Sequence, residues 1–528
     1  MRNFLVWLDG LTAIETENNL AKWLERAAFV FMILMFVSAP HSIAATQIAW
    51  LTGMFLWVVR LFIRPRPQLV RTPLDVPLWI FFGWSIVSSI FSYDPPTSFD
   101  RLRNVALFLI FYYVINLVRT KRTAVFLAST MILSAMVSVG WTPIERIIGR
   151  GVEISGVTAE SPLTKALIKN GDTLLKINGK KINAPEDLAA EIAANELSKV
   201  TFYRPDYYLT VDVWRKNLLG GAMAFERLGF TDWKRSRNWR SAGFYGHYTT
   251  FAEVLQLIAS LTLGLFIASF GKRFLSRKRA DDVEKQDTAS GGRWTLILAA
   301  CLVAMAFALL LTVTRGSQLA FLISAACMIF IVGNRKMLLV SAAIILPVAL
   351  GGLIFLQQSR EVGFFDANDD STKYRQTVYR EGVNLWLENP RHFFLGVGMD
   401  SIKKYAAEWR LFDDGKLPMG HFHSTPIQLL VERGLPALLL WLWVLWVYAR
   451  MLWRYLKSQM SDSEDWREIG IVLGCFGGLI GFLTAGLVHY NLGDAEVAMV
   501  FFMLMGLSVY IADAGCQRLV YQIDEKKI

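Results

Sequence analysis

Long apolar runs separated by short polar segments dominate the pattern of this chain. Many runs reach about 20 residues, which is the length that a helix needs to cross a bilayer, and they recur along most of the 528 residues. The composition agrees, because 54% of the residues are hydrophobic and only 19% are charged, whereas a soluble protein carries roughly a quarter charged residues. The pattern predicts an all-α polytopic membrane protein with about twelve transmembrane helices, near residues 22–40, 44–63, 75–92, 104–118, 123–142, 248–270, 294–312, 318–333, 337–356, 426–449, 468–488 and 495–514.

Lysine and arginine residues indicate the orientation of these helices. Basic clusters follow every second span, and this positive-inside pattern places both termini in the cytoplasm. The formal net charge of +11 therefore reports topology and contact with lipid headgroups, and no nucleic-acid partner is expected. The loops expected to face outward are 93–103, 143–247, 313–317, 357–425 and 489–494.

A stretch with a different pattern interrupts the membrane spans between residues 148 and 216. Alternating apolar residues predict short strands, Asn170-Gly171 and Asn178-Gly179 predict turns, and Pro185–Ala194 predicts a capped helix. The order of these elements resembles a bacterial PDZ domain, a small α+β fold. The matching segments are Gly151–Val157, Ser161-Pro162, Gly171-Asp172, Ile177–Gly179 and Glu186–Leu188.

The chain is therefore expected to have three parts. Residues 1–147 would hold membrane helices 1–5, residues 148–216 a periplasmic PDZ-like domain, and residues 217–528 membrane helices 6–12 with a large periplasmic loop at 357–425. PDZ domains bind an extended peptide end by strand addition, which implies a peptide or protein partner. No clear carboxylate-binding loop precedes Gly151, so a rigid spacer or a subunit contact is an equal alternative.

Histidines at the ends of the outward loops are the first candidates for chemistry. His423 stands just before an expected span, where Thr425 would cap the helix and Pro426 suits its first turn. A neutral imidazole at that place is suited to take a proton from a hydroxyl group, and His421 is a second candidate. The alternative is an interfacial histidine that only bonds the backbone. His489 lies in a short outward hairpin, where it would line the same cavity or cap a helix.

Arginines in the same outward segments are suited to bind phosphate. Arg315 begins a helix after a hairpin, and a permanent charge at a helix start fits a phosphate group. Arg375 precedes the glycine turn of the large loop, with Arg380 as a nearby rival. Arg240 precedes a glycine-containing segment that would let backbone approach a ligand. Each arginine could instead be a solvated or headgroup charge, and for Arg240 this would be within a membrane-lying strap at Phe230–Tyr248.

In their order along the chain, these residues resemble the O-antigen ligase and polymerase superfamily of bacterial envelope glycosyltransferases. That superfamily has an Arg-Gly hairpin in its middle spans, and then a large outer loop with arginine, proline-to-glycine, histidine and glutamate motifs. The sequence departs from the pattern at Ser424, where the family has asparagine, and by a longer proline-to-glycine spacing. The matching residues are Arg240–Phe244, Arg315-Gly316, Arg375 with Tyr379, Pro390, Gly396–Gly398, His423, and Glu432 with Gly434.

The resemblance implies a GT-C-like glycosyltransferase, and direct displacement would make it inverting. No Asp-x-Asp or His-x-x-x-His pattern stands out in the outer loops, so no metal ion and no cofactor are expected. By the resemblance, the enzyme would move a glycan from undecaprenyl diphosphate to an acceptor, such as lipid A-core, at the periplasmic face of a bacterial inner membrane. Its partners would thus be the lipid-linked glycan, the acceptor and membrane lipids. The implied catalytic residues are His423, Arg315 and Arg375, and the implied substrate-binding residues are Arg240, Arg380, His421, Glu432 and His489.

Other functions remain as alternatives. An O-antigen or exopolysaccharide polymerase and a protein O-oligosaccharyltransferase share the motifs. A transporter would need charges buried near the middle of the membrane. Only Glu432 fits that description; it lies about two turns inside its span, with Arg433 or another helix as its candidate partner. An intramembrane metalloprotease needs His-Glu-x-x-His on a helix, which the sequence lacks. A non-catalytic scaffold would tolerate loss of His423 and the two arginines.

Overall fold

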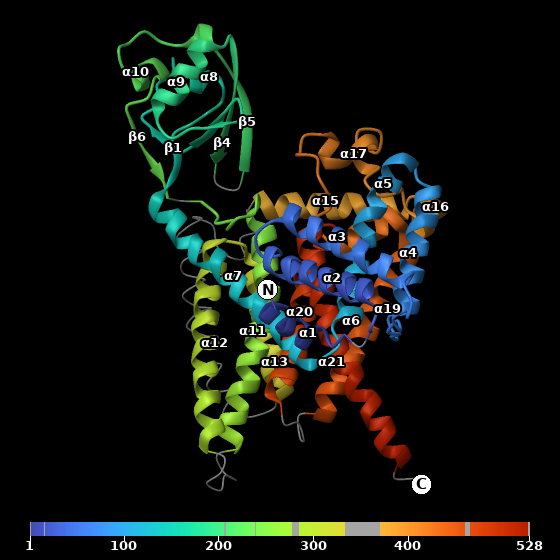
Figure 1. Ribbon diagram of the computed structural model, residues 1–528. Coiled ribbons are helices and arrows are strands. Elements are labelled where there is room, and N and C mark those ends of the chain that lie inside the picture. The colour runs from blue at the N-terminus through green and yellow to red at the C-terminus, as the bar shows by residue number, and fades with distance from the viewer. Residues whose placement is uncertain are drawn as a thin grey trace. The chain divides into compact units, whose positions relative to one another are not determined.

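The computed structural model describes residues 2–14, 16–204, 207–237, 239–276, 285–332, 370–459 and 465–525. The chain forms two compact units, of which one combines Met1–Val139 with Ala242–Ile528 and the other is Gly140–Ser241. Figure 1 shows the helices and strands of the two units. Each unit has a hydrophobic core of its own.

Helices build the first unit. The N-terminal helices are α1 (Arg2–Thr12), α2 (Asn19–Ser38), α3 (Ile43–Leu61), α4 (Asp75–Ile90), α5 (Pro95–Val105), α6 (Leu109–Leu117) and α7 (Lys121–Ile148), the last of which continues into the other unit. The later helices are α11 (Tyr248–Ser276), α12 (Lys285–Leu311), α13 (Arg315–Val332), α15 (Asp370–Leu387), α16 (Pro390–Leu395), α17 (Ile402–Tyr405), α18 (Leu411–Asp414), α19 (Thr425–Gln459), α20 (Trp466–Gly486) and α21 (Ala495–Glu525).

Eight of the described helices are long and apolar enough to cross a membrane, namely α3, α7, α11, α12, α13, α19, α20 and α21. This confirms the expected mostly helical, multi-pass membrane protein. The count of twelve spans stays a prediction, because α4 has only 16 residues and α6 only 9. α2 has 20 residues but carries Lys22, Glu25 and Arg26 near its start. The expected span at 337–356 lies outside the described residues.

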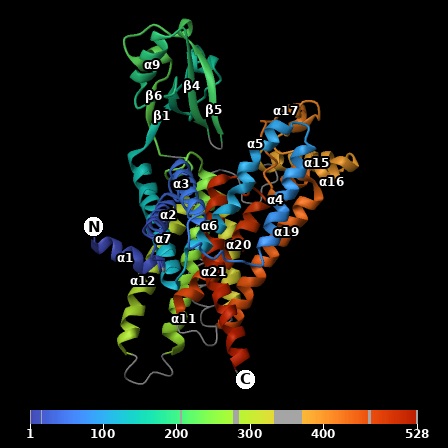
Figure 2. The ribbon, with the colours of Figure 1, turned by 45° about the vertical axis from the view of Figure 1, so that its right-hand side comes forward.

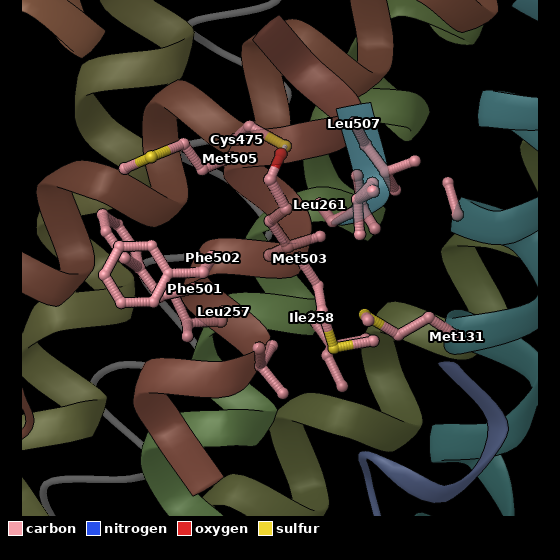
Figure 3. Close-up of a cluster of buried hydrophobic side chains, with 14 of the residues drawn as sticks. Met131, Leu257, Ile258, Leu261, Cys475, Phe501, Phe502, Met503, Met505 and Leu507 are labelled. Carbon is pink, nitrogen blue, oxygen red and sulfur yellow. Dashed lines mark hydrogen bonds between the residues drawn. The ribbon is translucent and has the colours of Figure 1, made fainter. Parts of the chain in front are cut away.

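Glycines let two central helices of the first unit pack closely. A side chain at Gly264 of α11 would collide with the backbone of Gly470 and Gly474 of α20. Small residues that allow such close approach are a common basis of helix association in membranes. Figure 3 shows part of the apolar core that these helices form with α21, including Leu257, Ile258 and Leu261 of α11, Cys475 of α20, and Phe501 and Phe502 of α21.

An antiparallel sheet forms the second unit. The strand order is β5-β4-β2-β1-β6, with β3 paired to β2. Figure 2 shows helix α9 and the strands of this unit. Leu188 and Ile192 of α9 are buried in one cluster with Val152 and Phe202 of the sheet. The helix predicted at Pro185–Ala194 is present as α9, whereas the likeness of the unit to a PDZ domain stays a prediction. The elements are β1 (Arg150–Ser155), α8 (Pro162–Lys165), β2 (Thr173–Ile177), β3 (Lys180–Lys181), α9 (Pro185–Ala194), β4 (Leu197–Arg204), β5 (Tyr207–Trp214), α10 (Ala224–Leu228) and β6 (Asp232–Ser236).

The predicted membrane-lying strap is wrong for residues 232–236. These residues form β6, which pairs with the outer edge of β1 and brings Lys234 opposite Glu153 and Trp233 opposite Ile154. Backbone groups on the edge of a sheet bind an additional strand readily. Trp233 also packs against the hydrophobic core of the unit, so its aromatic ring contacts protein side chains. The sheet therefore includes residues beyond 216.

Candidate active site

Four of the six histidines in the sequence come close together in the first unit. The ring centroids of His421 and His423 are 4.2 Å apart, those of His421 and His489 are 5.5 Å apart, and those of His423 and His489 are 6.3 Å apart. His247, directly before α11, is near enough to affect the protonation of His421 and His423. We call these four residues the histidine cluster.

Local contacts hold His423 in an uncommon backbone conformation. Its φ of 46° lies in the left-handed region, which costs a non-glycine residue about 1–2 kcal/mol. The Tyr379 hydroxyl of α15 donates to the His423 carbonyl at 2.9 Å, and the Tyr374 ring meets the imidazole edge-on at 5.5 Å. The His423 N–H donates to Nδ1 of His421 at 3.1 Å. Backbone strain that neighbours maintain in this way occurs often at functional sites.

Thr425 does not cap α19 as the sequence predicted. It is the first residue of that helix, and its hydroxyl donates to Asn491 Oδ1 at 2.8 Å and to the His489 carbonyl at 3.2 Å. Asn491 is fully buried, and a buried amide oxygen requires a donor. The hydroxyl of Thr425 therefore joins the start of α19 to the loop that carries His489.

Burial keeps two members of the histidine cluster neutral. Desolvation, followed by the effect of His421, lowers the pKa of His423 to about 2, and desolvation with His489 lowers the pKa of His421 to about 4. Because His421 Nδ1 accepts the His423 N–H, the proton of the neutral His421 ring lies on Nε2. The neutral His423 ring retains a nitrogen lone pair, which is what a general base requires.

His489 is held by a buried carboxylate. Its Nδ1 lies 2.8 Å from Oε1 of Glu253 on α11, whose side chain is 3% exposed. Burial lowers the pKa of His489, but the Glu253 carboxylate and Asp494 together raise it, so the net pKa is raised. The sequence analysis missed Glu253, because in the sequence it is a single acidic residue within an apolar helix. Only the folded chain brings it to His489.

Arg375 and the start of α13 lie at the histidine cluster. Arg375 is on α15, and its positive charge contributes to the lowered pKa of His423. Arg315 is the first residue of α13. A side chain on the next residue, Gly316, would approach Val488 Cγ2 to 2.9 Å, so this helix begins beside the residue that precedes His489.

Two predicted arginines lie on other parts of the fold. Arg380 is exposed on α15. Arg240 belongs to the other compact unit, Gly140–Ser241, in which it is 9% exposed. Their predicted roles in substrate binding remain predictions.

The glycine turn of the large loop fits into a break in α19. The break is at Gly434, whose φ is 74° and ψ is 177°. The Val397 N–H donates to the Val431 carbonyl at 2.8 Å, and the Gly398 N–H donates to the Glu432 carbonyl at 2.9 Å. A side chain at Gly396 would collide with the backbone of Glu432. The glycines in this motif therefore permit two backbone segments to approach each other.

The hydrogen bonds to Glu432 come from neutral donors, and the candidate partner Arg433 acts on it by charge alone. Its Oε1 accepts from the Asp400 N–H and from Gln428 Nε2, both at 2.9 Å. The Gln428 Oε1 in turn accepts from the Phe422 N–H at 2.8 Å. The carboxylate thus joins the loop at Asp400, the helix α19 and the segment that carries His421 and His423. The Asp400 N–H reaches this carboxylate because the loop folds onto the break in α19. Gln428 reaches it from the preceding turn of the same helix.

A cavity of about 300 Å³ adjoins the histidine cluster. Among the predicted site residues, His421 and Glu432 line it, together with Tyr490 from the His489 loop. Arg101, Lys403 and Arg433 also line it, and the sequence analysis assigned none of them to a ligand site. These cations come from α5, the large loop and α19, so nothing in the linear sequence marks them as neighbours.

Within the described part of the chain, no group of three or more histidine, cysteine, aspartate or glutamate residues is arranged to hold a metal ion.

Comparison with protein families supports the predicted superfamily. Residues 300–442 match the family model described as O-Antigen ligase. The match supports a ligase- or polymerase-type glycosyltransferase that acts on a lipid-linked glycan in a membrane. The matched segment includes the candidate residues Arg315, Arg375, Arg380, His421, His423 and Glu432.

Two curated proteins share a short segment with this chain, and both are named magnetosome formation protease MamE. The protein of Paramagnetospirillum magneticum is 46% identical over 43 residues, and that of Magnetospirillum gryphiswaldense is 42% identical over 45 residues. Each alignment covers 8% of this chain and 6% of the relative. The chain thus spans only a small fraction of these proteins, and their activity is not carried over to it.

Proposed function

We propose that this protein transfers a glycan from undecaprenyl diphosphate to the hydroxyl group of an acceptor, as an O-antigen ligase does. The observation that carries the proposal is the meeting of His423, His421, His489 and Arg375 at one place, three of them inside the segment that matches the ligase family. The reaction would take place at the periplasmic face of a bacterial inner membrane, with lipid A-core or a similar glycolipid as acceptor.

Each proposed residue has a role that its chemistry supports. The acceptor oxygen forms a bond to the anomeric carbon while the bond from that carbon to the diphosphate oxygen breaks, so the configuration is inverted. His423 takes the proton of the acceptor hydroxyl. Arg315 and Arg375 stabilise the negative charge that develops on the leaving diphosphate. In this scheme guanidinium groups supply the positive charge, and no metal ion is required.

The low pKa of His423 makes the base dependent on the donor. With a pKa of about 2, the free site holds a weak base. A bound diphosphate would place negative charge beside the ring, and a nearby opposite charge stabilises the imidazolium form. The base would therefore gain strength only when the donor is in place. The Glu253–His489 pair would hold the His489 ring in place beside His423. Arg240, Arg380, His421 and Glu432 would contribute to substrate binding.

The small sheet unit is proposed to be a PDZ-like domain that binds a peptide or protein. A protein acceptor would give such a unit a direct task, so a protein O-oligosaccharyltransferase is the second candidate within the superfamily. An O-antigen polymerase is the third, because it would use the same arginines and histidine. The acceptor therefore distinguishes the three functions.

Complementation of a strain that lacks this gene tests the proposal. Loss of a ligase leaves core lipid uncapped while carrier-linked polymer accumulates, whereas loss of a polymerase leaves single repeats on the core. The variants His423→Ala, Arg315→Ala and Arg375→Ala should each reproduce the ligase-null pattern at normal membrane levels. The matched control is Arg103→Ala, because Arg103 is an exposed arginine of the same unit that, among the described residues, forms an ion pair with Asp100. Normal capping by all three variants would refute the proposal.

A further inference from the structure

The cavity beside the histidine cluster has the chemistry of a site for a charged lipid headgroup. Its lining includes the apolar residues Leu78, Phe81, Phe108, Trp441 and Phe502. It also includes polar and charged residues, namely Arg101, Asp400, Lys403, Glu432, Arg433 and Tyr490. The helices α4 and α19, which provide much of this lining, lie side by side in Figures 1 and 2.

Arg433 is the key residue of this cavity, because it is a buried cation whose hydrogen bonds, within the described residues, go to neutral hydroxyl groups. It is 2% exposed. Its guanidinium donates to Ser85 Oγ at 3.2 Å and to the Tyr490 hydroxyl at 3.4 Å, and it lies over the Phe81 ring at 5.3 Å. In the described part of the chain it has no ion pair, and its buried Nε has no hydrogen-bond partner. A buried charge of this kind normally requires a counter-charge.

The carboxyl groups of the cavity accept from other donors, and Glu432 interacts with Arg433 by charge without a direct ion pair among the described residues. Asp400 is shared by two cations, Arg101 at 2.6 Å and Lys403 at 3.0 Å. Glu432 is occupied by the Asp400 N–H and the Gln428 amide. Three cationic side chains thus line the cavity against two carboxyl groups, which leaves an excess of positive charge for an anionic ligand.

We propose that this cavity binds the phosphate group of a lipid, with Arg433 as its main ligand and Arg101 and Lys403 at its rim. A phosphate would accept hydrogen bonds from the guanidinium groups, for which its geometry is well suited. The apolar residues of the lining would contact the adjoining lipid. His421 lines the cavity, and its ring is 4.2 Å from that of His423. This inference rests on the proposed function: the cavity would hold a phosphorylated glycolipid acceptor beside the base His423. The donor arginines Arg315 and Arg375 are not among the residues that line it.

Binding measured on the purified full-length protein tests this proposal separately from glycan transfer. The probes are dihexanoyl phosphatidic acid, the diacylglycerol that lacks its phosphate, and inorganic phosphate, each titrated against the protein in detergent. Phosphatidic acid should bind, the diacylglycerol should bind at least tenfold more weakly, and inorganic phosphate should also bind more weakly. Equal affinity for phosphatidic acid and diacylglycerol would overturn the proposal. Equal affinity for phosphatidic acid and inorganic phosphate would overturn its lipid part.

Variants locate the binding site. Arg433→Gln should weaken phosphatidic acid binding tenfold or more, since a hydrogen bond to a charged group is worth about that factor, and Arg433→Lys should weaken it less. Arg101→Gln at the rim should weaken binding severalfold, and it provides the test if Arg433→Gln does not fold. The control Arg103→Gln and the donor-site variant Arg375→Ala should bind as the wild type does. Unchanged binding by folded Arg433→Gln and Arg101→Gln would refute the cavity site while leaving the proposed function intact. Normal binding by a wild-type protein that transfers no glycan would refute the proposed function instead.

Discussion

Replacement of Gly434 by alanine tests whether the break in α19 determines the arrangement of the site. The backbone at this glycine has φ 74° and ψ 177°, a region that is essentially restricted to glycine and costs another residue about 1–3 kcal/mol. The added Cβ would lie 2.9 Å from the Leu395 nitrogen and still closer to the Phe394 carbonyl. Both atoms belong to the backbone, so the two segments would have to separate.

The magnitude follows from the bonds that this separation breaks. The two hydrogen bonds that join Val397 and Gly398 to α19 contribute about 1 kcal/mol each. With the conformational cost, the variant should lose about 3–5 kcal/mol of the free energy of unfolding. For a chain of this length, roughly 1 kcal/mol corresponds to one degree of melting temperature, so Tm should fall by about 3–5 °C. Glycan transfer should fall as well, because Glu432 and the His421 segment are held by the same contacts.

Two control glycines separate strain from contact. Gly415→Ala has a similar φ of 81° but no atom within 4 Å of the added Cβ, and Gly83→Ala has neither the unusual φ nor a neighbour. Melting curves of the purified variants in detergent should give the order Gly83→Ala highest, Gly415→Ala next and Gly434→Ala lowest. A Gly434→Ala protein that melts together with Gly415→Ala would show that the contact with Phe394 and Leu395 does not matter.

Three further predictions concern the histidine cluster and its arginine. His423 has a folded pKa of about 2 and an ordinary pKa near 6.5 when unfolded, so the unfolded chain binds more protons between these values and stability should fall as the pH is lowered below 6.5. His423→Gln should therefore gain in Tm relative to the wild type between pH 7 and pH 5, and a constant difference across that range would contradict the burial argument. Arg375→Ala should lower the transfer rate by about a hundredfold or more, the usual effect of removing one donor to a developing anion, with Arg375→Lys in between; equal rates for all three would exclude its role at the diphosphate. Glu253→Gln should lower the pKa of His489, seen as a lower midpoint in its NMR titration, and an unchanged midpoint would show that the 2.8 Å contact has no electrostatic effect.

The sequence predicted those features that depend on local patterns. Runs of apolar residues predicted the membrane helices, and the proline and acidic residues at Pro185–Asp187 predicted α9 at its observed bounds. The outward-facing loops were also expected to share one face of the membrane, which is consistent with the proximity of His423 and His489. Such features follow from the period and capping of single segments.

Features that depend on distant segments could not be predicted. Glu253 and His489 lie on different helices and loops, and an acidic residue within an apolar run gives no indication of its partner. In the sequence Arg433 is a candidate partner of the adjacent Glu432, whereas the Asp400 N–H of the loop and the Gln428 amide of α19 donate to that carboxylate. The strand at Asp232–Ser236 was mistaken for a membrane-lying segment because its aromatic and basic residues suit both environments. In each case tertiary contacts decided between interpretations that the sequence allowed.

The central claim is that Arg315, Arg375 and His423 together transfer a glycan from a lipid diphosphate. The most direct measurement is a reconstituted assay with purified protein, a synthetic undecaprenyl-diphosphate-linked glycan and a glycolipid acceptor, in which free undecaprenyl diphosphate and glycosylated acceptor are both quantified. The wild type should release one undecaprenyl diphosphate for each inverted glycosidic bond formed, and each single alanine variant should lose about a hundredfold or more of this rate. Full transfer by the protein in which all three residues are replaced by alanine would contradict the account.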